Sequence, residues 1–560
     1  PIAAGLGLAL FSSTLLAANT GENTNTPELK QPDFLPTNPT DPFQLPPIEE
    51  TRSSAIDTST AETLDIRLVQ FRGNTVIAAS ELEAISAPYL GRAVNAGELE
   101  ELRQKLSHYY VDRGFVNSGA LLAKDAYNNG TLTFTIIEGR LKAIRVRGLD
   151  GLDEDYVLSR LSDDSQQVLN INTLRERFQL LLDDPLFARI NARLMPDARF
   201  GDAILDIDVV RARPYQFNIS ANNYRPPSIG SETLGLSASI RNLTGYGDYL
   251  ETRVQSSIEG HNDLRTSLAW NMPLNHRGTS ISARLEHGRA SVIEEPISIL
   301  DIKSELDSRD IGLSHVVLET LNHKFTLGTN FIYQKNSTSL LGEPFSFILG
   351  VPDGVVKTDT WRLWQEYSYR TEVQALALRS NFSFVNNNVE RIAGLPPSVQ
   401  PDSQYLVWLG QAQYAKRVTD KGTQLILRGS VQYTRDNLLP LDRMSIGGVY
   451  TVRGFRENQL LRDTGAVFNA ELNCPLYRNG SGSFELHAGP FYDIGYGKNQ
   501  SANASTLSSI GLFTKARWHG FTLDLAWAKR LSYPSSINNG NSDLQDRGLH
   551  FQVSYSFPSP

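Results

Sequence analysis

The chain has 560 residues, 40% of them hydrophobic, and a formal net charge of −8 at pH 7. Its mean hydropathy of −0.28 and the absence of an apolar run of ~20 internal residues exclude a helical membrane bundle. The acidic balance argues against a nucleic-acid-binding protein, because phosphate contacts need a basic face. The single cysteine, Cys474, excludes an intramolecular disulfide framework. The sequence contains no phosphate loop, nucleophile elbow or metal-ligand spacing, so we predict no catalytic residue, no metal, no cofactor and no enzyme activity.

The first residues have the character of a targeting segment. The stretch 2–18 is apolar and uncharged, and it ends in Leu16-Ala17-Ala18-Asn19, which fits a signal-peptidase site. We predict that residues 1–18 are a signal peptide, truncated at its N-terminus, and that the chain is exported from the bacterial cytoplasm. The alternative is an apolar helix that belongs to the fold. Residues 19–61 carry seven prolines and predict an extended linker.

A small α+β unit is predicted over residues 62–140. It begins with a strand at 64–70, and a capping box at Ser80-Glu81-Leu82-Glu83 predicts the start of a helix. Asn95, with Glu98 in the first turn, is expected to cap a second helix that ends at Gly114. Strands are predicted at 116–123 and 131–138.

A second unit, residues 141–212, repeats the same β-α-α-β-β order about 75 residues later. Its predicted elements are a strand at 143–147, helices at 153–161 and 173–182, and strands at 188–195 and 203–210. Repetition of one small unit predicts an array of similar sheets, which is typical of binding modules.

From residue 213 to residue 560 the helical pattern gives way to an alternation of apolar and polar residues with a period of two. An even number of roughly ten-residue strands is typical of an outer-membrane barrel, whereas a soluble β-sandwich or propeller does not explain the aromatic face of the last strand. The sixteen predicted strands are 214–222, 232–241, 248–257, 263–271, 279–288, 307–318, 323–335, 358–370, 374–385, 404–416, 423–434, 463–474, 484–494, 508–518, 520–530 and 547–557.

The most informative motif, Val452-Arg453-Gly454-Phe455, lies in a long insertion between two of these strands, residues 435–462. An arginine among apolar residues is easier to explain if the loop folds into the barrel and the guanidinium meets a carboxylate there. The alternation places Glu471 and Asp493 on the inner faces of the next two strands. The alternatives are an ordinary glycine turn and two carboxylates that only contact water in the lumen.

These features together resemble the outer-membrane transporters of two-partner secretion, the haemolysin-activator and filamentous-haemagglutinin transporter family. The motifs that carry the resemblance are Arg72-Gly73-Asn74-Thr75, Tyr89-Leu90-Gly91-Arg92, Ile137-Glu138-Gly139-Arg140, Val452-Arg453-Gly454-Phe455, Gly465 through Glu471, and Phe491-Tyr492-Asp493-Ile494-Gly495. The resemblance implies two periplasmic POTRA repeats followed by a 16-stranded transmembrane β-barrel. It also implies that Arg453 pairs inside the barrel with Asp493 and Glu471, on a wall that includes Phe491 and Gly495.

The function that we expect is export of an unfolded protein across the outer membrane. The POTRA-like units would bind the exoprotein in the periplasm through a sheet edge, and the barrel would pass it to the cell surface. Other expected partners are outer-membrane lipid and the barrel-assembly machinery that inserts the chain, and no nucleic acid is expected. The alternatives are a barrel-assembly factor of the same superfamily and a diffusion porin, which leaves the repeats and the arginine loop unexplained.

Overall fold

The computed structural model describes residues 29, 33–35, 43–44, 63–123, 125–161, 168–259, 263–396, 399–500, 503–535, 537 and 543–558. The predicted signal peptide and most of the predicted linker lie outside the described residues. The chain divides into two compact units, residues 38–213 and residues 214–560 together with the first 37 residues. None of the described helices is long and apolar enough to cross a membrane.

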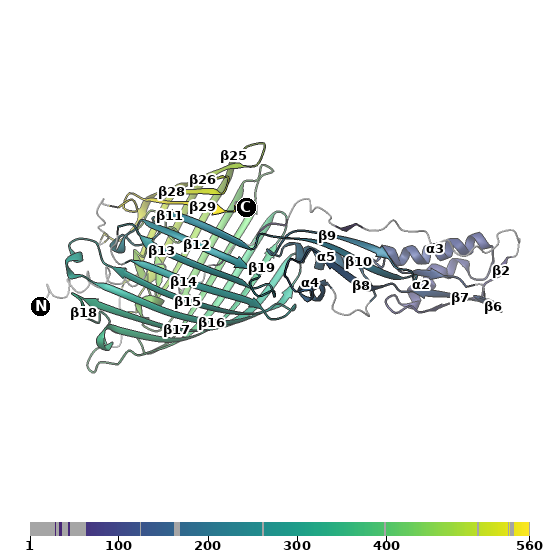
Figure 1. Ribbon diagram of the computed structural model, residues 1–560, viewed down its shortest axis with the longest axis horizontal. Coiled ribbons are helices and arrows are strands. Elements are labelled where there is room, and N and C mark those ends of the chain that lie inside the picture. The colour runs from purple at the N-terminus through teal and green to yellow at the C-terminus, as the bar shows by residue number, and fades with distance from the viewer. Residues whose placement is uncertain are drawn as a thin grey trace. The chain divides into compact units, whose positions relative to one another are not determined.

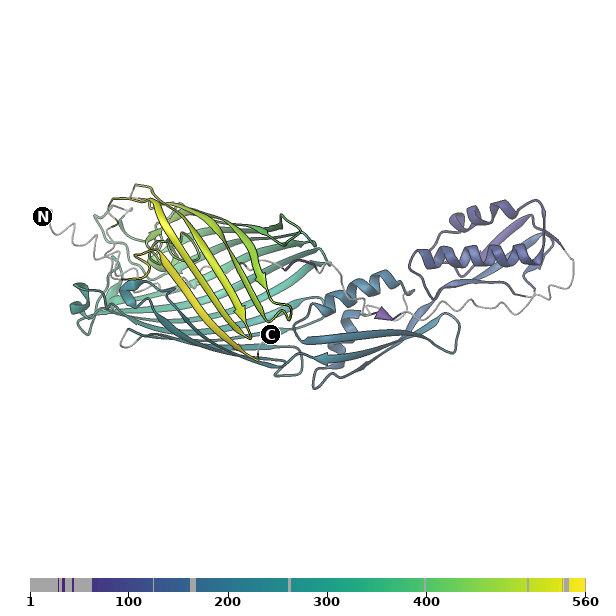
Figure 2. The ribbon, with the colours of Figure 1, turned by 90° about the horizontal axis from the view of Figure 1, so that it is seen from above.

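The first repeat packs two helices against one face of a small sheet (Figure 2). β3 (Leu68–Arg72) lies parallel to β7 (Thr131–Ile137), which pairs antiparallel with β5 (Gly119–Leu121). Apolar side chains of the helices and the sheet, such as Leu102 and Phe134, are fully buried between them. The other elements are α2 (Ala79–Ser86), η1 (Ala87–Tyr89), α3 (Ala96–Asp112), β2 (Leu64–Asp65), β4 (Ala93–Val94) and β6 (Tyr127–Asn128).

The two predicted helix starts in this repeat have different outcomes. Asn95 forms the predicted capping box: its side chain accepts from the Glu98 N–H at 2.9 Å, and the Glu98 carboxylate accepts from the Asn95 N–H at 2.9 Å. The capping box predicted at Ser80 is wrong, because α2 already begins at Ala79 and has no side-chain cap. Glu138 instead fixes the chain ahead of α2 by accepting from the Thr75 and Val76 N–H groups at 2.6 and 2.9 Å.

The second repeat has the same topology as the first. β10 (Asp202–Arg211) lies parallel to β8 (Arg140–Arg147) and antiparallel to β9 (Phe187–Pro196), as β7 does with β3 and β5. Two residues of the linker, β1 (Phe43–Gln44), add a short parallel strand to the other side of β9. The helices are α4 (Glu154–Leu161) and α5 (Ile171–Leu182), whose apolar faces cover the sheet.

Sixteen long antiparallel strands close into a barrel within the described residues, which confirms the predicted barrel (Figure 1). Each strand overlaps one of the predicted segments. They are β11 (Tyr215–Asn222), β12 (Thr233–Arg241), β13 (Tyr249–Ser257), β14 (Leu264–Pro273), β15 (Thr279–Ser291), β16 (Lys303–Glu319), β17 (His323–Leu340), β19 (Val355–Arg370), β20 (Gln374–Asn387), β21 (Gln404–Arg417), β22 (Gln424–Tyr433), β25 (Thr464–Arg478), β26 (Phe484–Lys498), β27 (Ser505–Trp518), β28 (Phe521–Ser532) and β29 (Leu549–Phe557).

The barrel closes where its first strand meets its last. β11 pairs with β29 from Phe217↔Phe557 to Asn222↔Gln552, and we call this pairing the closing seam. Connections at the end of the barrel where β11 begins are short, such as the two residues between β27 and β28. At the opposite end, called here the outer end, the loops are longer and include β18 (Glu343–Pro344), β23 (Met444–Ile446), β24 (Leu460–Arg462) and the 3-10 turns η2 (Pro227–Ile229), η3 (Ile297–Leu300), η4 (Pro352–Gly354) and η6 (Pro440–Asp442).

The alternation of side chains along the strands separates an apolar outer face from a mixed inner face. On β29, Val553 and Phe557 are 41% and 53% exposed on the outer face, whereas His550 is fully buried on the inner face. Large apolar side chains are exposed on the same outer face all around the barrel, as expected for a wall that contacts lipid. They include Phe217, Leu236, Trp361, Phe384, Phe468, Leu512 and Trp527.

The described residues near the start of the chain contact the barrel. The Leu29 carbonyl accepts from the Gln413 side chain of β21 at 2.6 Å, and the Leu35 N–H donates to the Thr371 carbonyl at 3.1 Å. Leu29 is buried, and Gln413 has the opposite parity to the exposed Leu406, so this contact lies on the inner face. Part of the predicted linker therefore lies inside the barrel.

Candidate functional site

The long loop between β22 and β25, residues 434–463, folds back against the inner face of the barrel. β23 and β24 pair to form a hairpin in it, and the segment between them carries the Val452-Arg453-Gly454-Phe455 motif. Gly454 has a φ of +89°, a conformation that a side chain disfavours. Val452 and Phe455 are fully buried, in a cluster with Ile446 of β23 and residues of the wall strands β25 and β27. Burial of these two apolar side chains orients the arginine between them.

Arg453 contacts carboxylates on two adjacent wall strands. Its Nε and Nη2 donate to the two oxygens of Asp493 on β26, both at 2.8 Å, and its Nη1 donates to Glu471 on β25 at 2.8 Å. Its backbone N–H also donates to Asp493, at 3.1 Å. Only 7% of the Arg453 side chain is exposed, against 9% for Glu471 and none for Asp493. The planar guanidinium thus uses a bidentate and a single contact at once, which a lysine cannot reproduce.

Neighbouring side chains complete the surroundings of the ion pair. The Phe491 ring lies under the guanidinium, 3.4 Å from its central carbon to the ring centroid. Asn469 donates to Asp493 at 2.8 Å, and Arg428 donates to Glu471 at 3.5 Å. Glu471 therefore has a second cation in reach, whereas Asp493 forms its ion pair with Arg453.

The peptide after the arginine is held by β28 and β29, which lie beyond β27 on the same side of the barrel. The Gly454 N–H donates to Nε2 of His550 on β29 at 3.1 Å, and its carbonyl accepts from Arg530 on β28 at 2.6 Å. Because Nε2 accepts this bond, His550 carries its proton on Nδ1 and is neutral. A Cβ at Gly454 would lie 2.8 Å from the Cβ of Ala528, so the close approach of the loop to β28 needs a glycine.

Glycines on the wall make room for the loop. A Cβ at Gly495 would lie 2.4 Å from Ile446 and 2.9 Å from Val452, and a Cβ at Gly497 would lie 2.7 Å from Ile446. Gly465 on β25 is similarly close to Met444 and Ile446, at 3.1 and 3.3 Å. Side chains of the loop thus occupy the volume that wall side chains would otherwise fill.

The structure brings together all the residues that the sequence singled out for this site, namely Val452, Arg453, Gly454, Phe455, Glu471, Phe491, Asp493 and Gly495. Sequence reasoning missed His550, Arg530 and Arg456, which contact the loop or belong to it. Arg456 follows the motif directly, and His550 is the histidine of the last strand's inner face, but neither spacing nor alternation identifies a partner for them.

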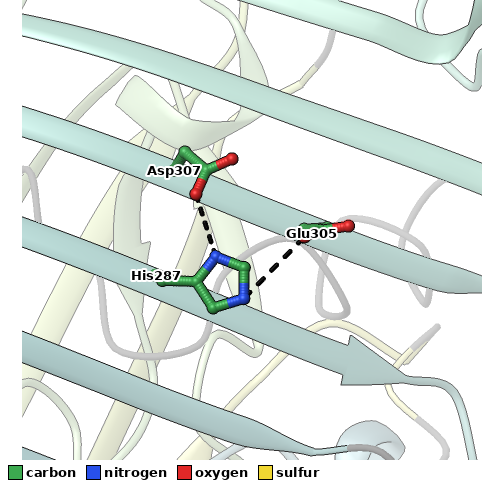
Figure 3. A group of neighbouring side chains, drawn as sticks. All are labelled: His287, Glu305 and Asp307. Atoms are coloured by element: carbon green, nitrogen blue, oxygen red, sulfur yellow. Dashed lines mark hydrogen bonds and ion pairs between the residues drawn. The ribbon is translucent and has the colours of Figure 1, made fainter.

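One group of side chains within the described residues has the composition of a metal site. His287 on β15 lies between Asp307 and Glu305 on β16 (Figure 3). Its Nδ1 is 2.9 Å from Asp307 and its Nε2 is 3.8 Å from Glu305, so its two ring nitrogens face different carboxylates. Arg289 is 3.6 Å from Glu305 as well. Ion pairing accounts for this partly exposed group, and we assign no metal to it.

Comparison with known proteins identifies the family of the chain. Residues 201–516 match the model of the haemolysin secretion/activation protein family ShlB/FhaC/HecB, and residues 64–139 match the POTRA domain of ShlB type. The outer membrane transporter CdiB of Dickeya dadantii strain 3937 is 22% identical over 490 residues, covering 84% of this chain and 83% of the relative. The heme/hemopexin transporter protein HuxB of Haemophilus influenzae strain 86-028NP is 22% identical over 489 residues, covering 85% and 84%.

A solved structure agrees with the fold. CdiB from Escherichia coli covers 91% of this chain and 94% of its own, with a TM-score of 0.69 and 18% sequence identity. The family match extends over more than half of the chain and includes most of the barrel strands. The chain therefore belongs to the ShlB/FhaC/HecB haemolysin secretion/activation family, whose members are outer-membrane transporters of two-partner secretion with periplasmic POTRA domains.

Proposed function

We propose that this transporter captures one unfolded exoprotein with its POTRA repeats and that Arg453 holds the long loop inside the barrel until the exoprotein passes. The observation that carries this proposal is the contact of Arg453 with Asp493 and Glu471. The loop strands β23 and β24 pair with each other and not with β25 or β26, which carry these carboxylates. Ion pairs, side-chain hydrogen bonds and a buried apolar cluster hold the loop, so it can leave without breaking the barrel's backbone ladder.

The strand β8 is the edge at which we place exoprotein binding. The outer side of β9 is already paired with β1, whereas β8 pairs with β10 on one side and, among the described residues, has only the Arg140↔Val168 bridge on the other. An extended peptide can add to such an edge through its backbone. The strand has basic residues at 140, 142, 145 and 147. Lys142 and Arg147 already pair with Asp197 and Asp206, so the charge that favours a segment with acidic side chains comes from positions 140 and 145. Affinity is expected to be modest, because ordering an unfolded segment offsets part of the contact energy.

We also infer that transport uses no catalytic chemistry of the chain's own and is driven by folding of the exoprotein outside the cell. Residues 1–18 act as the signal peptide, residues 19–61 as the linker, residues 62–140 and 141–212 as the two repeats, and residues 213–560 as the barrel with its inward loop 435–462. The barrel-assembly machinery inserts the chain into the outer membrane.

We expect a gene beside this one to encode a large exoprotein, and the direct test is its secretion in cells with and without the transporter. We expect the exoprotein in the medium only when the transporter is present. If deletion of the transporter instead depletes other outer-membrane barrels, the chain is an assembly factor.

Binding at β8 is tested with Arg145→Pro and Val146→Pro, compared in titrations with the exoprotein's secretion domain. Successive N–H groups of a strand point to opposite sides, so one of the two prolines removes an outward donor and leaves the β8–β10 ladder intact. Undiminished binding by both folded variants would rule out this edge.

A further inference from the structure

The loop between β28 and β29 contains a fully buried glutamine whose side chain joins three separate segments. The Gln545 amide group donates to the Asn223 and Arg225 carbonyls at 2.6 and 2.7 Å, and its oxygen accepts from the Glu457 N–H at 2.8 Å. Asn223 and Arg225 follow β11, whereas Glu457 lies in the long loop just after the Phe455-Arg456 pair. One side chain therefore connects the long loop to the segment that follows β11, the first strand of the barrel.

Asn223 continues the closing seam beyond its last backbone pair. Its backbone N–H donates to the Phe551 carbonyl at 3.3 Å, its side-chain oxygen accepts from the Phe551 N–H at 2.8 Å, and its side-chain amide donates to the Leu549 carbonyl at 2.9 Å. The ladder itself holds six residue pairs, against eight between β11 and β12. The fully buried Asn223 side chain thus supplies bonds to β29 where the backbone ladder has ended.

A second arginine of the long loop contacts the residue next to Gln545. Arg456 donates to both oxygens of Asp546 at 2.6 and 2.7 Å, and to Glu294 in the loop after β15 at 2.7 Å. The Asp546 side chain is fully buried, and that of Arg456 is 14% exposed. Arg530 of β28 donates to the carbonyls of Gln545 and Asp546 at 3.3 and 3.1 Å. The contacts of Arg456 with Asp546 and Glu294 are therefore separate from those that Arg453 makes with the barrel wall.

We propose that Gln545 and Asp546, together called the outer anchor, couple the position of the long loop to the strength of the closing seam. When the loop withdraws, the buried Gln545 oxygen and the Asp546 carboxylate both lose a donor. A buried polar group without a partner is costly, so the loop between β28 and β29 rearranges to recover hydrogen bonds. That rearrangement removes the donors of the Asn223 and Arg225 carbonyls and weakens the seam at the outer end. Since coupling is reciprocal, a weakened seam also favours release of the loop.

The test is hydrogen–deuterium exchange of the full-length chain in nanodiscs, without any exoprotein, so that its result is independent of the proposed export. Peptides covering 444–462 report on the loop, and peptides covering 215–223 and 549–557 report on the seam. The variants are Gln545→Ala, Arg456→Ala and Asn223→Ala. The matched control is Arg435→Ala, an exposed arginine of the same loop whose side chain contacts Tyr433.

We expect exchange to become about tenfold faster in both the loop and the seam for each of the three variants, as the loss of a buried hydrogen bond implies. The Asn223→Ala variant is the most informative, because its substitution lies in the seam and its predicted effect is in the loop. Arg435→Ala should change neither region, and β16 and β17 should stay protected in every variant. Faster exchange in the loop with an unchanged seam, or the reverse, would overturn the coupling. Exposure of β16 and β17 would show misfolding, and the pair Gln545→Asn and Arg456→Lys then replaces the alanine variants.

Discussion

Arg453 donates three hydrogen bonds to the single carboxylate of Asp493, two from its guanidinium at 2.8 Å and one from its backbone N–H at 3.1 Å. The backbone bond fixes where the loop lies relative to β26, and the side-chain bonds fix how the guanidinium is oriented. Asp493 consequently positions the main chain of the motif as well as its charge. Glu471 contacts only one nitrogen of the same guanidinium.

Removal of the Arg453 side chain should abolish secretion and leave membrane insertion intact. Arg453→Ala leaves two buried carboxylates without their shared cation, a loss of about 3–5 kcal/mol for a broken buried pair. The barrel ladder does not involve this side chain, so the variant should reach the outer membrane at normal abundance. We expect altered conductance in planar bilayers and little exported exoprotein. Arg453→Lys should restore little secretion, because lysine lacks the planar guanidinium that contacts both carboxylates. Secretion at the wild-type level by Arg453→Ala would disprove the proposal that Arg453 holds the loop inside the barrel.

The two carboxylates should not be equivalent. Asp493→Ala removes three bonds to Arg453, whereas Glu471→Ala removes one and leaves Arg428 free of its partner on the wall. We therefore expect Asp493→Ala to resemble Arg453→Ala and Glu471→Ala to retain part of the secretion. Exoprotein in the medium, normalised to transporter in the outer membrane, gives the comparison. Equal defects, or a larger defect in Glu471→Ala, would contradict this order.

A methyl group on the wall should displace the loop without touching any charge. Gly495→Ala places a Cβ 2.4 Å from Ile446 and 2.9 Å from Val452, and overpacking of this kind costs about 1–3 kcal/mol. The control is Gly480→Ala, in the turn between β25 and β26, where a Cβ meets nothing within 4 Å. We expect higher conductance or more frequent opening for Gly495→Ala only. Identical channel records for the two variants would show that the loop is not packed against Gly495.

A charged substitution should destabilise the barrel far more on the outer face of β29 than on its inner face. Val553 is 41% exposed on the outer face, and its neighbour Gln552 has the opposite parity. Val553→Arg should cost about 2–4 kcal/mol if the residue lies at the bilayer midplane, and Gln552→Arg should cost much less. Folding titrations into lipid vesicles measure both values. Similar stability of the two variants would mean that the outer face of β29 does not contact lipid.

The barrel and the repeats could be predicted because their evidence is local. A period of two along each strand identifies which residues share a face, and this placed Glu471 and Asp493 on the inner wall before any contact was known. The pairing with Arg453 needed the resemblance, because a loop of about 30 residues can contact many wall positions. His550 and Gln545 escaped notice for a related reason. Their partners are backbone groups of segments far away in the chain, and no residue pattern marks a backbone acceptor. The error at Ser80 has the same origin, since Glu138, which directly follows β7, secures the chain ahead of α2.

The glycines under the long loop have a consequence for whatever travels through the lumen. Gly465, Gly495 and Gly497 face side chains of the loop and offer none of their own. If the loop withdraws as we propose, the wall at these three positions is backbone alone, with its N–H and C=O groups already paired in the ladder between β25 and β26 and with Val467 beside Gly495. A polypeptide passing there meets no side chain at the three glycines, but two residues from Gly495 it meets the Asp493 carboxylate, which has then lost Arg453. The withdrawn loop therefore leaves a flat strip of wall with an unpaired negative charge at its edge.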